Sequence, residues 1–496
     1  MSPRDTSGNN PLIRYVNRQQ MSWQALDVDK LIGEEHPARA IWELVGSLDL
    51  TGFYEGIASS AEQGGRPAYD PQMLISLWVY AYSEGIGSAR EVARRCGFDP
   101  AFRWLTGLQE VNYHTLADFR VQRQQELDEL FTQVLAALSK EGWIRLEQVM
   151  QDGTKIGALA SGRSFQREEG IREHLQRARK RLAEMGDPRN EEASPRVKKA
   201  QERARQEKQE QLQRALQELQ KLKEQKGAGA AGEQNKVSVS DPEARFMKQS
   251  DGGLAPSYNV QISSDAAYGI IVGVEVTQQA NDSAQLLPAV ERIEERLRRK
   301  PQQMVADGSY TTREAIEQMA ERGIDFLGSM GREEMPSGAT HPRRLPPSAF
   351  VFDPESNRFR CPEGKLLSPR GRQHEGPGVI YYRYRAHAED CFSCSRQAEC
   401  CPGNQRRGRS VMRREESAAV TAFRKKMASA EAQQQYRRRA HIAEFCHAWI
   451  KCKLGLRQFH VRGAIKARAE ALWACFTYNL QQWIRLSIVH TAATIS

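Results

Sequence analysis

The spacing of apolar residues divides the chain into a helical first part and a mixed remainder. In the first 145 residues the apolar positions recur at helical spacing, most clearly over 72–83, 89–96 and 115–140. Short strand-like runs follow, separated by helical stretches. These runs lie at 146–151, 244–248, 258–263, 269–277, 302–306 and 324–329. Strands and helices mixed in this way predict an α/β fold behind a helical N-terminal domain.

Two of the strand-like runs end in the same pair of residues. One leads into Asp152-Gly153 and the other into Asp307-Gly308, with helical stretches on both sides of the second. A carboxylate at the carboxyl end of a strand lies where open α/β sheets bind ligands. If the two strands are neighbours, two hard oxygen ligands meet, as Mg²⁺ chemistry requires. An ordinary turn is the alternative for either pair alone, because Asp-Gly is common in turns.

Two stretches interrupt this α/β pattern. Residues 163–232 have apolar positions every three or four residues, among Arg and Lys alternating with Glu and Gln. This pattern predicts an antiparallel helical hairpin inserted into the core as a solvated arm. DNA contact and dimerisation are the alternatives for this arm. The second insertion, 338–415, contains most of the cysteines.

Five of the nine cysteines lie between Cys361 and Cys401. A local cluster in a chain without an export signal is typical of a metal site rather than a disulfide framework. Cys361, Cys391 and Cys394, with Cys400 or Cys401, provide four thiolates for tetrahedral Zn²⁺. Such a site would be structural, because four thiolates leave no open position for chemistry. Unligated thiols are the alternative.

Charge and hydropathy narrow the class of partner. The net charge is +10 and the pI about 9.1, which favours a polyanionic partner, with nucleic acid first. The start of the chain is polar, and no apolar run reaches the roughly 18 residues of a membrane span. We therefore expect a cytoplasmic protein without a membrane segment.

Basic residues gather at two places that suit DNA contact. Arg90 and Arg94 lie in the second helix of a helix–turn–helix-like pair, for which a plain helical hairpin is the alternative. Arg437 and Arg439 belong to a long basic stretch before the C-terminal helices. A solvated face is the alternative there, and phosphate contact is the interpretation we prefer.

The third candidate acid lies in the helix that follows. Glu444 and Lys451 are seven residues apart, which places both on one helical face. Aspartate, aspartate and helical glutamate in this order, with Lys451 trailing, resemble the DDE transposases of bacterial insertion sequences. The similar branch has a helical N-terminal domain and a Cys-containing insertion. Its motifs resemble Pro71-Gln72-Met73-Leu74-Ile75 and His114-Thr115-Leu116-Ala117-Asp118-Phe119-Arg120 here.

The resemblance implies an RNase H-like core, a mixed sheet with helices on both faces. The domains are then the helical N-terminal domain 1–145, the first part of the core at 146–335, the Cys-rich insertion 338–415 and the C-terminal core helices 416–496. Asp152, Asp307 and Glu444 match the family's acids and would hold Mg²⁺ or Mn²⁺. Glu470 is the alternative third acid.

The implied activity is cleavage at transposon ends and strand transfer into target DNA. Double-stranded DNA is then the partner, bound by a homodimer associated with the bacterial nucleoid. Lys451, Arg439 and Arg437, with Arg90 and Arg94 of the N-terminal domain, are the expected DNA contacts. A non-catalytic DNA-binding protein derived from a transposase is the alternative, and a structure-specific nuclease on the same core is a third possibility.

Overall fold

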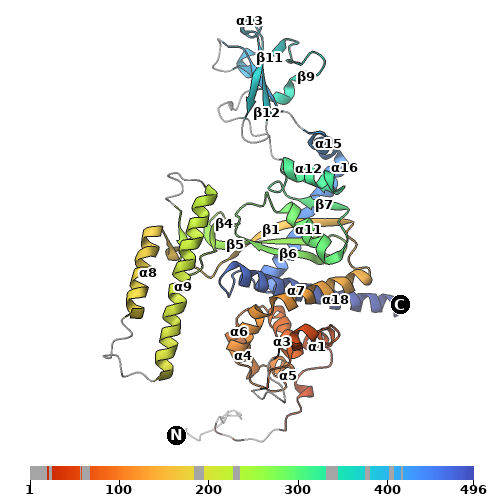
Figure 1. Cartoon of the computed structure of the whole chain (residues 1–496). Helices are drawn as coiled ribbons and strands as arrows, with labels where there is room; N and C mark the ends of the chain where they lie inside the picture. The colour runs from red at the N-terminus through yellow and green to blue at the C-terminus, as the bar shows by residue number, and fades with distance from the viewer. Residues whose placement is uncertain are drawn as a thin grey trace, which may run out of the picture.

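The computed structural model describes residues 19, 21, 25–55, 57, 67–183, 195–226, 235–330, 345–374, 380–401, 407–414 and 417–495. A helical bundle at the N-terminal end packs below a central mixed sheet, and two smaller units project from the core (Figure 1). The α/β architecture behind a helical N-terminal region is thereby confirmed. Within the described ranges, no helix is long and apolar enough to cross a membrane.

The N-terminal bundle is built around one almost completely buried helix. This helix, α3 (Pro71–Ser83), begins where the Asp70 side chain accepts a hydrogen bond from the Gln72 amide, and Pro71 occupies its first turn. Around it lie α1 (Pro37–Gly46), α2 (Thr51–Glu55), α4 (Ala89–Cys96), α5 (Pro100–Leu105), α6 (Tyr113–Gln122) and α7 (Gln124–Lys140). The single helix expected over 115–140 is wrong. Arg123 leaves the helical conformation, with φ −101° and ψ 50°, and separates α6 from α7.

The bundle shares its hydrophobic core with the last helix of the chain, α18 (Ala464–Ile495). The Arg120 guanidinium lies 3.4 Å from the Glu470 carboxylate, and their side chains are 3% and 0% exposed. Arg120 also donates to the Gly87 carbonyl at 2.6 Å, and the Glu470 carboxylate contacts the His460 ring nitrogen at 2.8 Å. The contact between Arg120 and Glu470 therefore joins the N-terminal bundle to α18.

The central sheet contains six strands, of which only β5 runs against the others. The strands are β1 (Gln148–Gly157), β4 (Arg245–Lys248), β5 (Leu254–Asp265), β6 (Ile271–Thr277), β7 (Gln303–Ala306) and β8 (Asp325–Leu327). β1, β7 and β8 are parallel neighbours. β5 pairs antiparallel with β1 on one side, and with β4 and β6 on the other. The order across the sheet is thus β6-β5-β1-β7-β8, with β4 beside the start of β5.

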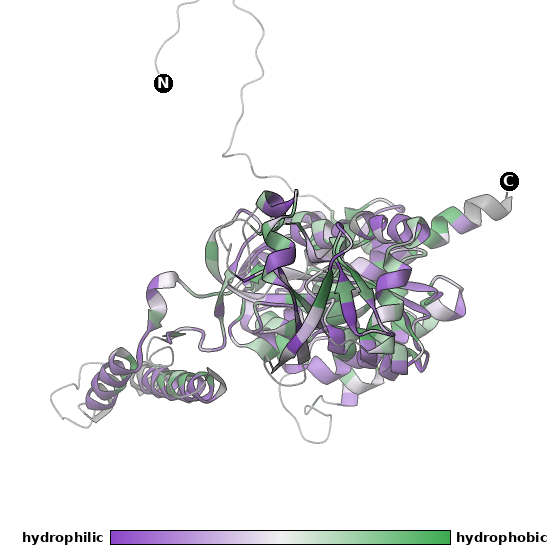
Figure 2. Ribbon diagram, turned by 90° about the horizontal axis from the view of Figure 1, so that it is seen from above, coloured by the Kyte–Doolittle hydropathy of each residue, from purple (hydrophilic) through white to green (hydrophobic). Residues whose placement is uncertain are grey.

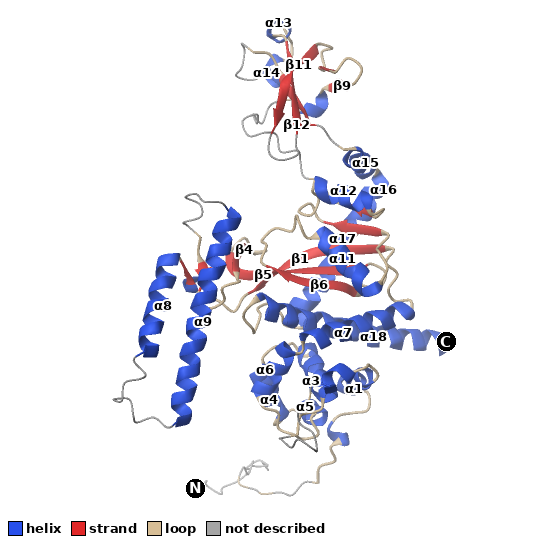
Figure 3. Cartoon of the chain, in the orientation of Figure 1, coloured by secondary structure: helices blue, strands red, loops and turns tan. Residues whose placement is uncertain are grey.

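Helices connect and cover these strands. α11 (Leu286–Leu297) packs against β6 and lies over the sheet in the view of Figure 3, and α12 (Arg313–Glu321) packs against β8. α15 (Ala418–Met427), α16 (Ala430–Arg437) and α17 (Arg439–Ala448) lead to a π-helical turn, Trp449–Lys453. Met150, Val305 and Leu327 of the sheet form a cluster with Ala432 of α16 and Ala443 of α17. α17 therefore covers the sheet where β1 and β7 pair.

The arm has a small core of its own and is anchored at its base. α8 (Glu168–Ala183) and α9 (Pro195–Lys226) enclose Ile171, Leu175, Leu212, Ala215 and Leu219, and Figure 2 shows the pair apart from the main body. The first residues of the predicted hairpin are not helical, because Phe165–Gln166 forms β2 and pairs with β3 (Val237–Ser238). Arg245 of β4 binds Glu218 of α9 at 2.9 Å, which fixes the arm to the sheet. The turn expected between the two helices lies outside the described residues.

The Cys-rich insertion contains a sheet that the sequence analysis missed. β9 (Val351–Asp353), β10 (Arg358–Arg360), β11 (Leu366–His374), β12 (Ile380–Ala386) and β13 (Ser410–Arg414) form five antiparallel strands in the order β13-β12-β11-β10-β9. Two short helices, α13 (Ala388–Phe392) and α14 (Gln397–Cys400), lie between the last two strands. The module has its own core of Phe350, Phe359, Leu367, Tyr384, Ala386 and Val411.

Candidate active site

The two Asp-Gly aspartates leave neighbouring strands at the same level. β1 and β7 pair in parallel from Gln148–Gln303 to Gln151–Ala306, so the next residues are Asp152 and Asp307. The pairing therefore brings together two carboxylates that are 155 positions apart in the chain. One expectation was wrong: β1 does not end at Asp152-Gly153 but continues to Gly157, because the longer strand β5 still pairs with it.

Gly153 is thus a strand residue, and close packing explains why it has no side chain. A Cβ atom at Gly153 would lie 2.6 Å from Gln261 Nε2, 2.8 Å from Asp282 Oδ1 and 3.0 Å from Asn259 Oδ1. These three polar side chains approach the backbone of β1 directly beside Asp152. The absence of a side chain lets them do so.

Replacing Gly153 with alanine should therefore displace this polar group and disturb the neighbouring aspartates. Overpacking of this kind costs about 1–3 kcal/mol of stability, and we expect DNA cleavage to fall further than stability does. Thermal unfolding and cleavage rate measured together test this. Gly33→Ala is the matched control, because nothing lies within 4 Å of its Cβ position. Wild-type cleavage by Gly153→Ala would contradict the packing argument.

The Asp152 carboxylate lacks a full counter-charge. Its pKa is raised to about 6, chiefly by burial and also by the nearby charges of Asp307 and Asp282, although the Gly153 amide and Arg439 oppose the rise. The Gly153 amide donates to Asp152 Oδ1 at 2.8 Å, and Arg439 lies 3.5 Å from Oδ2. A carboxylate that is 17% exposed beside two further acids is an environment that a bound cation would stabilise.

Asp307 is held by the turn that follows it. Its Oδ1 accepts hydrogen bonds from the Ser309 amide at 2.7 Å and from the Ser309 hydroxyl at 2.5 Å. The next residue, Tyr310, is buried, and its hydroxyl donates to Gln261 Oε1 on β5. The turn is therefore tied to the sheet on the far side of β1.

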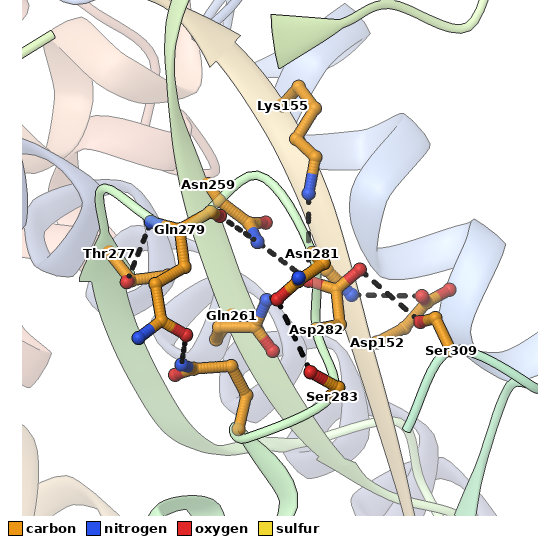
Figure 4. A network of polar contacts seen from close by, with 12 residues as sticks. Asp152, Lys155, Asn259, Gln261, Thr277, Gln279, Asn281, Asp282, Ser283 and Ser309 are labelled. Atoms are coloured by element: carbon orange, nitrogen blue, oxygen red, sulfur yellow. Dashed lines mark hydrogen bonds and ion pairs between the residues drawn. The ribbon is translucent and has the colours of Figure 1, made fainter. Parts of the chain in front are cut away.

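A third acid, Asp282, lies at this place and was missed in the sequence (Figure 4). Its Oδ1 accepts hydrogen bonds of 2.6 Å from both Asn259 Nδ2 and Gln261 Nε2, and Lys155 Nζ is 3.5 Å away. The Ser309 hydroxyl lies 3.4 Å from its Oδ2. Asp282 precedes a helix and has no Asp-Gly pattern. The nearest sequence signal is the polar run Asn281-Asp282-Ser283 between a strand and a helix.

α17 brings the remaining predicted residues to the other flank of Asp152. The His447 ring nitrogen lies 3.9 Å from Asp152 Oδ2, and burial with the charges of Lys451 and Arg439 lowers its pKa to about 4, so the ring is neutral at pH 7. Glu444 lies one helical turn before His447 and is exposed. Within the described part of the chain, the Glu444 side chain has no hydrogen bond or ion pair. Glu470, the alternative acid, is not here but in the buried contact with Arg120.

The predicted DNA contacts divide between two regions. Arg439 lies beside Asp152, Lys451 is close enough to His447 to lower the pKa of that ring, and Arg437 is exposed at the end of α16. Arg90 and Arg94 are on α4, in the bundle that α7 and α18 separate from the sheet (Figure 1). Arg94 pairs with Glu91 at 2.7 Å, while the Arg90 guanidinium lies over the Tyr113 ring.

The five clustered cysteines line one small pocket of the Cys-rich module. The backbone amides of Lys365 and Arg409 donate to the sulfurs of Cys361 and Cys391, at 3.3 and 3.4 Å. None of the nine cysteines, all of which lie in the described ranges, takes part in a disulfide. Across the described ranges, no three His, Cys, Asp or Glu side chains are placed closely enough to hold a metal ion, either here or at the aspartates.

Comparison with known families gives two matches. A model described as a transposase DDE domain matches residues 360–484, which include Glu444 and Lys451 but neither aspartate. A model described as a transposase domain (DUF772) matches residues 26–122, which form most of the N-terminal bundle. No curated protein matches the chain. These two matches confirm the resemblance, seen in the sequence, to the DDE-type transposases of insertion sequences.

Proposed function

We propose that this transposase cuts DNA at the ends of its element and joins the freed ends to target DNA, using Asp152, Asp307 and Glu444. The observation that supports this most is the meeting of Asp152 and Asp307 on parallel neighbours, with the Glu444 helix packed over the same strands. The strand order β6-β5-β1-β7-β8, with only β5 reversed among them, supports an RNase H-like core.

The donor set fits a divalent cation. Carboxylate oxygens are the ligands that Mg²⁺ and Mn²⁺ prefer, and the raised pKa of Asp152 shows that its negative charge is poorly compensated. Bound Mg²⁺ or Mn²⁺ would activate the attacking water or 3′-hydroxyl and stabilise the leaving oxygen. Glu444 would provide the third carboxylate, since its side chain is exposed and lies on the face of α17 that contains His447.

The chain's own residues position the acids and the DNA. The Ser309 turn fixes Asp307, and the Gly153 amide fixes Asp152. Arg439 provides positive charge beside Asp152, and Lys451, near His447, would add to it where the DNA backbone passes. Arg437, and Arg90 and Arg94 on α4, would contact DNA farther from the cut. A homodimer would hold the two transposon ends together, acting at the bacterial nucleoid.

Joining, rather than cutting, distinguishes a transposase from a nuclease on the same core. Purified protein should join a pre-cut transposon end with a free 3′-hydroxyl to a supercoiled plasmid in Mg²⁺, and gel electrophoresis would show the joined product. Cleavage without any joined product would favour the nuclease. Binding without cutting or joining would favour the non-catalytic DNA-binding alternative.

We also propose that the Cys-rich module holds a structural Zn²⁺. Cys361, Cys391, Cys394 and Cys400 would be its ligands, with Cys401 as the alternative fourth. Their common pocket and the backbone amides directed at two sulfurs suit thiolate ligands.

Metal analysis of the purified protein should therefore find one zinc per chain. Cys391→Ser should lose it and expose the module to proteolysis, because metal binding and folding are coupled in small metal-bound modules. Cys452→Ser is the control, since Cys452 is exposed and lies outside the module. Zinc-free wild-type protein with reactive Cys391 and Cys394 thiols would refute the site.

A further inference from the structure

We infer that Lys155 contacts a phosphate of the DNA strand being cut, and that Asp282 is the positioning residue that holds its ammonium group at the acids. This inference rests on the proposed function, because it assigns a substrate contact to the same site. Neither residue was among those expected from the sequence.

Lys155 reaches the acids from the side opposite α17. It lies on β1 beyond the end of the pairing with β7, and Figure 4 shows its side chain directed along the strand toward Asp282. The side chain is 17% exposed, so the ammonium group is partly buried but still accessible. A strand lying over Asp152 and Asp307 would then have Arg439 on one flank and Lys155 on the other.

Asp282 is well suited to anchor this lysine because it cannot easily move. Its Oδ1 is fixed by Asn259 and Gln261 of β5, and Gln261 is fixed in turn by Gln151 and Tyr310. The lysine itself is held less tightly, at 3.5 Å. An ammonium group has three N–H donors, and a single oxygen at that distance leaves donors for a further anion.

A second lysine lies close enough to Lys155 for the two like charges to interact. Burial lowers the pKa of Lys155, and the carboxylates of Asp282, Asp152 and Asp307 only offset this effect. Burial also lowers the pKa of Lys451, and the like charges of Arg457 and Lys155 contribute. Lys155 and Lys451, from separate elements, therefore repel each other. A phosphate between them would relieve this repulsion, and lysine binds phosphate as a point charge.

A structural role alone explains the pair poorly. A partly buried ion pair returns little or no net stability, because taking two charges out of water costs about as much as their attraction provides. Apolar residues would fill the same space. The positive charge of Lys155 has a use if a phosphate of the DNA binds beside it.

The test measures single-turnover cleavage of end-labelled DNA in Mg²⁺, together with DNA affinity. Lys155→Gln should slow cleavage by about 10- to 100-fold, because it removes a contact to the reacting strand. Affinity should change by less than about threefold, since many phosphates share the binding. Lys155→Arg should recover most of the rate. Lys248→Gln is the matched control: it removes one exposed charge from β4 of the same sheet.

DNA with single methylphosphonates near the cut separates contact from structure. The neutral linkage at the contacted phosphate should slow the wild type but have little further effect on Lys155→Gln, because the partner charge is already gone. Asp282→Asn should show the same loss of sensitivity, and combining it with Lys155→Gln should add little. Cleavage by Lys155→Gln at the wild-type rate would overturn the inference. So would methylphosphonates that slow Lys155→Gln and Asp282→Asn as much as they slow the wild type, at every position. Cleavage that survives Asp307→Asn would instead refute the proposed function.

Discussion

Replacing Asp307 with asparagine should abolish strand cleavage by this transposase while leaving its affinity for DNA nearly unchanged. The substitution removes a carboxylate charge but keeps the shape of the side chain and an oxygen that can accept from the Ser309 amide. Loss of one member of a catalytic unit costs about three or more orders of magnitude in rate. DNA affinity depends mainly on basic residues and should persist. Cleavage assays and a filter-binding titration on the same preparations provide the two measurements.

Glu444→Gln should have the same effect, which makes it a sharp test of the third acid. Glu444 is exposed, so the substitution should change stability by no more than about 0.5 kcal/mol. Normal cleavage by Asp307→Asn would refute the site as a whole. If Glu444→Gln cleaves DNA normally and Asp307→Asn does not, only the assignment of Glu444 as the third acid would be refuted.

Replacing Glu470 with alanine should destabilise the protein strongly. The change leaves the Arg120 guanidinium, which is 3% exposed, without its carboxylate. Removing one partner of a buried ion pair costs about 3–5 kcal/mol. Because Arg120 belongs to the N-terminal bundle and Glu470 to α18, unfolding should begin by separating the two ends of the chain.

Denaturant unfolding followed by tryptophan fluorescence tests this, since Trp78 and Trp473 are buried beside Arg120. Glu444→Ala is the control, because it removes an exposed carboxylate from the same C-terminal region. Equal stability of Glu470→Ala and Glu444→Ala would contradict a stabilising role for the Arg120–Glu470 ion pair between the bundle and α18.

The two Asp-Gly pairs were visible in the sequence because each follows an apolar run. The sequence predicted that the two aspartates lie close together only if their strands are neighbours, and no local pattern specifies that β1 and β7 are neighbours. In the structure β1 and β7 are neighbours, since they pair in parallel from Gln148–Gln303 onward. Gly153 was wrongly predicted to end the strand, because the reason for a glycine there lies in β5 and the Asp282 loop.

Asp282 shows why part of the site was not predictable. Its partners come from β1, β5 and the turn after β7, so no spacing along the chain marks it. The sheet of the Cys-rich module had a local signal that was overlooked: Tyr382, Tyr384 and Ala386 alternate with Arg383 and Arg385 along β12. Apolar stripes run through both α6 and α7, and the break at Arg123 is set by backbone geometry that these stripes do not specify.

The most direct test of the central claim is cleavage of end-labelled DNA from the flanks of the gene by wild type and by Asp152→Asn, in Mg²⁺ or Mn²⁺. The carboxylate site predicts cutting by the wild type at one defined position, dependent on the metal and absent in the variant. Binding of this DNA without cleavage by either protein, or equal cleavage by both, would contradict it.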